Sequence, residues 1–188
     1  MAVQERVYTN ADAFWELSRE FEDQRYELIE GVVYEMPLTG EEHGVVSLEV
    51  GALILMHVKA NDLGRVTGAE TGYVLHRRPN GRDTVLAPDV GFVAKTRMTE
   101  TPSQQFAELA PDLAVEVLSP SQTYTQMARK VQVYLRYGTR MVLILDPIEK
   151  VIFVHTPTGT TTLEISDTLD GGDVLPGFQV EVKKLFGD

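Results

Sequence analysis

Two apolar segments, joined by a stretch with helical spacing, constrain the fold of this chain more than any other feature. The segments are residues 113–118 and residues 141–146, and each reads as a strand buried on both faces. Between them, residues 122–137 have the periodicity of an amphipathic helix, which Gly138 ends. Strand, helix and buried strand in this order predict a parallel crossover, so the two segments should be neighbours in one sheet.

One charged side chain, Glu116, interrupts the first of these segments. An ionised carboxylate in a dry interior carries a large energetic penalty unless it finds a partner, a proton or a metal. A second acid, Asp89, lies in the same way inside the apolar residues 85–93. We interpret both acids as functional, because two carboxylates on adjacent core strands can hold a divalent cation.

Residues 41–60 show helical rather than alternating spacing. Their apolar positions recur every three or four residues, at Val45, Leu48, Ala52, Leu55 and Met56. Asn61 and Gly64 supply a stop signal at the end of the segment. We expect this helix to cover one face of the sheet with that apolar stripe.

Strand-forming segments account for much of the remaining chain. A hairpin is predicted around Gly31, and further strands follow residue 150, separated by turns at residues 171–172 and 176–177. The predicted fold class is therefore α/β, with a mixed β-sheet flanked by helices and additional antiparallel strands. With 188 residues and no internal repeat, the chain is expected to form a single domain over residues 1–188.

Composition limits the metals that the chain can bind and the compartment in which we expect it. The chain has no cysteine, so any metal must be held by oxygen or imidazole ligands, which favours magnesium or manganese over structural zinc. The first residues lack a basic region followed by an apolar stretch, and no uncharged apolar run approaches the ~20 residues of a membrane span. We therefore expect a cytoplasmic protein with no membrane partner.

The formal net charge of −11 argues against a nucleic-acid partner, because the overall field repels phosphate. A polyanion nevertheless responds to the local patch, and basic residues do cluster around residues 77–82 and on the later helix, which carries Arg129 and Lys130. The simpler interpretation of each cluster is a solvated loop or helix surface. Net charge alone does not decide whether the chain binds nucleic acid.

Lys130 is the basic residue best placed to approach Glu116. On a helix that returns antiparallel to its strand, Lys130 lies ~12 Å from the connection at ~1.5 Å per residue, against ~10 Å for Glu116 at ~3.3 Å per residue. The two side chains should therefore lie level with each other. Lys130 also stands beside the stripe of Met127, Val131 and Tyr134, although an exposed lysine fits this pattern equally well.

Short motifs follow one another in a recognisable order along most of the chain. They are residues 26–31, His43, residues 87–90, residues 115–121, residues 134–135, residues 145–147, residues 175–178 and residues 185–186. Taken together, they resemble the Uma-type restriction endonuclease-like family, within the PD-(D/E)XK nuclease superfamily. Each motif is weak by itself, but the ordered set is fairly specific.

The resemblance implies a restriction-endonuclease-like core, hydrolysis of DNA phosphodiester bonds with Mg²⁺ or Mn²⁺, and a homodimer. By position, it implies catalytic roles for Glu27, Asp89, Glu116 and Lys130, and metal coordination by Asp89, Glu116 and Val117. Candidates for substrate contacts are His43, Ser119 and Arg129.

The chain departs from the superfamily pattern in the position of its lysine. The basic motif has lysine two residues after the acid, where this chain has Leu118, so activity would depend on Lys130 reaching in from the helix to position or deprotonate a metal-bound water. Three of the candidates also have simpler roles. Glu27 fits a solvated strand residue, His43 fits a capping histidine, and Ser119 fits a helix cap because no G-x-S-x-G elbow surrounds it.

Three functions fit these residues. The first is a metal-dependent DNA endonuclease. The second is a non-catalytic binding or assembly module on the same fold, which the acidic balance and the displaced lysine favour. The third is a metal-dependent hydrolase of small phosphorylated substrates, which avoids the conflict with net charge. No helix-turn-helix or zinc-finger motif is visible, so the sequence predicts no base specificity.

Overall fold

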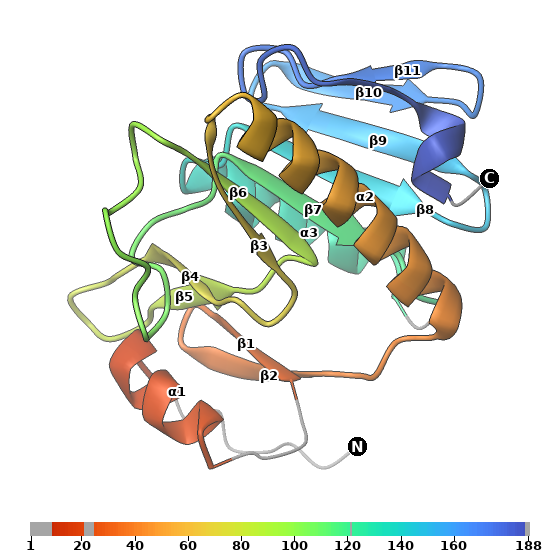
Figure 1. Cartoon of the computed structure of the whole chain (residues 1–188). Coiled ribbons are helices and arrows are strands. Elements are labelled where there is room, and N and C mark those ends of the chain that lie inside the picture. The colour runs from red at the N-terminus through yellow and green to blue at the C-terminus, as the bar shows by residue number, and fades with distance from the viewer. Residues whose placement is uncertain (1–8, 21–24, 121, 187–188) are drawn as a thin grey trace.

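The computed structural model describes residues 9–20, 25–120 and 122–186 (Figure 1). Its helical elements are α1 (Ala11–Ser18), α2 (Glu41–Ala60), α3 (Tyr124–Arg136) and the 3-10 helix η1 (Val182–Phe186). Its strands are β1 (Arg25–Ile29), β2 (Val32–Met36), β3 (Gly64–Gly68), β4 (Tyr73–His76), β5 (Thr84–Leu86), β6 (Val90–Ala94), β7 (Leu113–Val117), β8 (Met141–Asp146), β9 (Val151–Thr156), β10 (Gly159–Leu163), β11 (Thr168–Asp170) and β12 (Gln179–Glu181).

The strands form a six-stranded mixed sheet, a four-stranded antiparallel sheet and a two-stranded ribbon. The six-stranded sheet has the order β10-β9-β8-β7-β6-β3, and the four-stranded sheet has the order β2-β1-β5-β4. Within the larger sheet only β7 and β8 run parallel, with Leu113 opposite Met141 and Glu116 opposite Ile144. The predicted crossover and the predicted α/β class are therefore confirmed.

The crossover helix α3 begins later than the sequence suggested. Its N-cap is Thr123, whose side chain accepts a hydrogen bond from the backbone N–H of Gln126, and the Gln126 side chain accepts one from the backbone N–H of Thr123. This reciprocal capping box satisfies two backbone donors at the helix start. Ser119 therefore does not cap the helix, and Ser121 lies outside the described residues.

The strand β7 sends alternate side chains to opposite faces of the larger sheet. Leu113, Val115 and Val117 join the core cluster under α2, whereas Ala114 joins the cluster under α3. Figure 1 shows α2 crossing the front of this sheet and α3 lying behind it. The alternation places the Glu116 side chain on the α3 side, where it bonds to residues of that helix.

The apolar residues 85–93 were expected to form one strand, and this expectation was wrong. The structure divides them between β5, in the four-stranded sheet, and β6, in the six-stranded sheet. Pro88 lies in the link; proline has no backbone N–H to donate to a ladder, which favours such a break. Asp89 consequently stands at the junction of the two sheets, immediately before β6, rather than inside a strand.

The α2 helix has the predicted bounds but not the predicted orientation. Its buried side chains form a different stripe, Val46, Val50, Ile54 and Val58, which packs in the core cluster. The predicted stripe faces outward, and Leu48 is 74% exposed. The helix is thus apolar on both faces. By length and composition α2 also qualifies as a candidate membrane span, but a helix packed in a protein core passes the same test.

Substitutions on the two faces of α2 distinguish the observed orientation of the helix from the predicted one. Ile54→Ala should lower the free energy of unfolding by about 2–5 kcal/mol, because it removes a fully buried side chain and leaves a cavity. Met56→Ala, on the outer face, should change it by less than about 0.5 kcal/mol. Urea denaturation followed by circular dichroism measures both values, and equal losses would contradict the orientation described here.

Candidate active site

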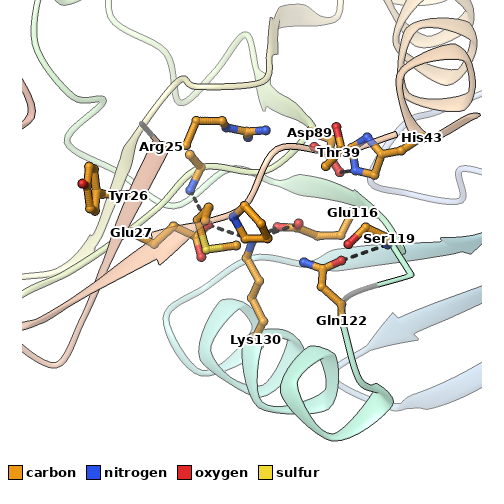
Figure 2. Close-up of a pocket in the computed structure, with 13 residues that line it drawn as sticks. Arg25, Tyr26, Glu27, Thr39, His43, Asp89, Glu116, Ser119, Gln122 and Lys130 are labelled. Atoms are coloured by element: carbon orange, nitrogen blue, oxygen red, sulfur yellow. Dashed lines mark hydrogen bonds and ion pairs between the residues drawn. The ribbon is translucent and has the colours of Figure 1, made fainter. Parts of the chain in front are cut away.

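Five of the predicted site residues converge on one pocket at the junction of the two larger sheets. Glu27 comes from β1, His43 from the first turn of α2, Asp89 from the link before β6, Glu116 from β7 and Lys130 from α3. Figure 2 shows these side chains pointing toward one another from separate elements. Further polar residues line the same pocket: Arg25, Thr39, Ser119 and Gln122.

Lys130 occupies the centre of the site and is buried. Its Nζ lies 2.8 Å from Glu116 Oε1 and 2.8 Å from Glu27 Oε1. The expectation that Lys130 lies level with Glu116 is therefore confirmed, and the alternative of an exposed lysine is wrong. Glu27 also accepts a hydrogen bond from the backbone N–H of Ala87 at 3.1 Å, so it is not a solvated strand residue.

Tyr134 completes the surroundings of Glu116. Its hydroxyl donates to Glu116 Oε1 at 2.7 Å, and Lys130 donates to Glu116 Oε2 at 2.9 Å. Residues four apart on a helix share a face, so Lys130 and Tyr134 present both donors from one side of α3. The sequence reasoning treated Tyr134 only as a core residue. Its i, i+4 spacing from Lys130 was the signal that could have identified it.

Two groups, one from β7 and one from α2, hold the Asp89 carboxylate in place. Its Oδ2 accepts a hydrogen bond from the backbone N–H of Val117 at 2.8 Å and lies 3.2 Å from His43 Nε2. The other ring nitrogen of His43, Nδ1, lies 3.3 Å from the Ser47 hydroxyl. His43 is buried, so it is neither an exposed nor a simple capping residue. Asp89 Oδ1 takes part in neither contact.

Burial and neighbouring charges move the pKa values of these groups in opposite directions. Burial, reinforced by the charges of Asp89 and Glu27, raises the pKa of Glu116 to about 8, although Lys130 opposes the change. Burial also acts to raise the pKa of Asp89, but His43, Val117 and Lys130 outweigh it, and the pKa lies below its ordinary value.

The pKa of Lys130 is raised by its neighbouring carboxylates and not by burial. Burial acts to lower it, but the carboxylates of Glu116 and Glu27 outweigh that effect, and the pKa lies above its ordinary value. The side chain therefore stays protonated at neutral pH, and Lys130 is a cation that can orient a water or stabilise a negative charge. It is not a base that could remove a proton.

The pocket has more negative than positive charge to accommodate. Three carboxylates share the pocket with the ammonium group of Lys130 and the guanidinium group of Arg25, so full ionisation leaves a net charge of −1 when His43 is neutral. The cavity among these residues measures about 30 Å³, which is room for one or two water-sized species. A divalent cation would cancel the excess, and carboxylate oxygens are the ligands that Mg²⁺ and Mn²⁺ prefer.

The donor set fits a cation that substrate and water help to coordinate. Among the described residues, no three His, Asp or Glu side chains are arranged to enclose a metal ion by themselves. Mg²⁺ commonly takes one or two protein carboxylates and completes its shell with water and substrate phosphate. Asp89 and Glu116 meet that requirement, with Lys130 already bonded to one of them.

The remaining predicted residues lie at the edge of the site or outside it. Ser119 is buried in the pocket wall, and its backbone N–H donates to Gln122 Oε1 at 3.1 Å. Val117 contributes its backbone N–H to Asp89. Arg129, predicted to contact substrate, is exposed on α3 and does not line the pocket, because the neighbouring position of the helix points inward.

Arg25 is a pocket residue that the sequence reasoning missed. It stands at the start of β1, and Figure 2 shows its side chain extending across the pocket in the direction of Thr39 and Asp89. No local pattern distinguishes it from any other arginine at a strand end. Only the approach of β1 to the larger sheet gives it a place beside the acids.

The raised pKa of Glu116 should make the free energy of unfolding depend on pH. The folded chain holds this proton more tightly than the unfolded chain, whose ordinary value is 4.5. The stabilisation is therefore full below about pH 4.5 and is lost as the pH rises through about 8. Glu116→Gln cannot ionise, so its free energy of unfolding should fall less than that of the wild type between pH 5 and pH 8, by at least about 1 kcal/mol.

Urea denaturation in the presence of a chelator measures this difference, because the chelator removes cations that would otherwise stabilise the acids. Glu164→Gln, at an exposed position, is the matched control and should retain the pH dependence of the wild type. Parallel pH profiles for Glu116→Gln and the wild type would show that Glu116 ionises normally.

Comparison with known proteins agrees with this fold and pocket. The crystal structure of "a putative nuclease belonging to DUF820" from Anabaena variabilis ATCC 29413 is similar, with a TM-score of 0.74 and 24% sequence identity. The match covers 86% of this chain and 89% of that chain. At this identity the likeness establishes the fold alone, which is that of a nuclease-like α/β protein.

The family follows from a match to the sequence itself. The family model Uma2, described as "Putative restriction endonuclease", matches residues 11–183. The chain belongs to the Uma2 family, which confirms the resemblance found in the sequence. No curated protein matches the chain. Family and fold together indicate a restriction-endonuclease-like nuclease, and hence a hydrolase.

Proposed function

We propose that this chain is a divalent-metal-dependent endonuclease that hydrolyses DNA phosphodiester bonds in the pocket around Lys130. The observation that supports this most is a buried set of three carboxylates around one ammonium group, in a pocket where acidic groups outnumber basic ones. Restriction-endonuclease-like nucleases generally use divalent metals, and the excess charge is of the sign that such an ion would neutralise. We expect the protein to act in the cytoplasm and as a homodimer.

In this proposal Asp89 and Glu116 hold Mg²⁺ or Mn²⁺, and the backbone carbonyl of Val117 is a further candidate ligand. The ion would polarise the phosphodiester and make a water more acidic at neutral pH. His43 holds Asp89 in position through its Nε2. Tyr134 does the same for Glu116 through its hydroxyl.

Lys130 orients the attacking water and stabilises the negative charge that develops on the phosphate, because it stays protonated beside two carboxylates. Glu27 bonds to the same ammonium group and fixes its position. At the pocket mouth, Arg25 is the cationic group available to a phosphate oxygen, and Ser119 and Gln122 offer polar contacts. Arg129, if it contacts DNA, does so beyond the pocket.

Cleavage of plasmid DNA tests the proposal directly. Wild-type protein should nick or linearise DNA in Mg²⁺ or Mn²⁺ and lose this activity with a chelator. Asp89→Asn and Lys130→Met should each reduce the rate at least about 100-fold, because each removes an electrostatic contribution to the transition state. Lys183→Met, at an exposed lysine distant in sequence from the site, is the control and should cleave normally.

Circular dichroism must show that each variant stays folded, since both substitutions alter a buried charge network. A folded wild type that cleaves no DNA in either metal would favour the non-catalytic module. Metal-dependent hydrolysis of a small phosphodiester that duplex DNA does not inhibit would favour the third function, a hydrolase of small substrates. These outcomes separate the three candidate functions.

Arg25 should influence substrate binding more than chemistry. Arg25→Ala should raise the KM for DNA about tenfold, by roughly the 1.4 kcal/mol of one charge-assisted contact, with a smaller change in kcat. Arg136→Ala, at an exposed arginine at the far end of α3, should leave both constants unchanged. Steady-state kinetics on a short duplex measures both values, and equal effects of the two substitutions would exclude a specific role for Arg25.

A further inference from the structure

The outer face of α2 carries a stripe that is apolar in the middle and charged at both ends, and it lies outside the core clusters of the described residues. Its members recur with alternating spacings of four and three: Glu41, Val45, Leu48, Ala52, Leu55 and Lys59. Val45 is 50% exposed and Leu48 is 74% exposed, and the nearby Met56 is 60% exposed. Figure 1 shows α2 at the front of the molecule, with no other element drawn over its outer side.

This exposure is unusual for a helix whose other face already lies in a core. A surface helix is ordinarily apolar on one side and polar on the other, whereas a helix that is apolar all round is usually buried all round. Alternating spacings of four and three are those of a coiled-coil seam, at which one helix packs against another. The stripe therefore has the pattern of a helix-binding surface.

The order of residues along the stripe suits a second copy of α2 as the partner. Spacings of 4, 3, 4, 3 and 4 read the same in both directions, with their centre near position 50. An antiparallel copy of α2 would place Leu48 opposite the partner subunit's Ala52, and Val45 opposite the partner subunit's Leu55. Large and small side chains would then interdigitate at the centre of the contact.

Charge complementarity selects the same arrangement. The stripe begins with Glu41 and ends with Lys59, and both side chains are exposed. In an antiparallel pair each Glu41 faces Lys59 of the partner subunit, so two opposite-charge contacts form. In a parallel pair like charges would meet, which disfavours that orientation.

We propose that two copies of this chain associate about a two-fold axis through antiparallel pairing of their α2 helices, centred near position 50. Such a contact is isologous, since the same surface serves both subunits. The pairing involves neither the pocket nor the proposed endonuclease function. It assigns a surface and a symmetry to the expected homodimer.

The contact should be modest in strength. It spans ~27 Å of helix at ~1.5 Å per residue and involves one helix from each subunit, which places it at the small end of specific interfaces. We expect dissociation on the order of micromolar concentrations. The buried stripe on the opposite face argues against insertion of α2 into a membrane, because insertion would detach Val46, Val50, Ile54 and Val58 from the core.

Cysteine cross-linking tests the pairing, because the natural chain contains no cysteine. Val45→Cys and Leu55→Cys chains, mixed and oxidised, should form a disulfide-linked dimer. Either variant alone should cross-link poorly, since identical positions would lie ~15 Å apart along the axis, beyond the ~7 Å limit for a disulfide. Ile148→Cys, at another exposed apolar position, is the control. Equal cross-linking of the mixture and the single variants, or no cross-linking, would overturn the proposal.

Sedimentation equilibrium provides the second measurement. Leu48→Glu should weaken the dimer at least tenfold, and Glu41→Lys or Lys59→Glu should each weaken it severalfold. The double variant Glu41→Lys with Lys59→Glu should recover dimerisation, because the swapped charges again face each other across the axis. A wild-type chain that remains monomeric at roughly 200 µM, or a double variant no better than the single ones, would overturn the proposal.

Matched thermal melts keep these outcomes interpretable. The six substituted side chains lie outside the core clusters, and five of them are exposed, so each variant should remain folded. If wild-type protein is monomeric and instead floats with phospholipid vesicles, the stripe serves a lipid surface and the dimer is excluded. Neither result would bear on DNA cleavage, so the two proposals can fail separately.

Discussion

The buried contact of Lys130 with Glu27 and Glu116 is the interaction on which the arrangement of the molecule depends. It joins three elements, because Glu27 lies on β1 of the smaller sheet, Glu116 on β7 of the larger sheet and Lys130 on α3. Removing water from three ions is costly, and only close pairing recovers that cost. The contact therefore requires the two sheets and the helix to meet with little freedom of position.

The carboxylates around Lys130 outnumber the cationic groups. Such an excess is expected at a binding site rather than at a contact that only stabilises the fold. One pair of opposite charges would be enough to stabilise a buried ion. In this pocket two glutamates already share one lysine, and the carboxylate of Asp89 lies beside them. Burial is the main cause of the raised pKa of Glu116, and this excess of negative charge adds to it. Proteins tolerate such unfavourable local electrostatics mainly at functional sites.

Much of this organisation was predictable from local pattern. The apolar runs around Glu116 and before Asp146 predicted the parallel pair β7 and β8, and the distances along strand and helix predicted that Lys130 lies beside Glu116. Other features were not predictable. Pro88 divides one apolar run between two sheets, and α2 turns its longer apolar stripe outward, because the choice between two apolar faces depends on which surface packs best on the sheet.

The sequence by itself determined the elements, the crossover and the two core acids, because periodicity and the cost of burying charge act locally along the chain. Tertiary structure alone decided that Tyr134 and Arg25 join those acids, and it brought Glu27 and His43, which the ordered motifs had suggested, into the same pocket. These residues reach the pocket from β1, α2 and α3, and their side chains meet only when the sheets and helices have packed. Convergence of this kind depends on contacts between distant segments, which no local pattern records.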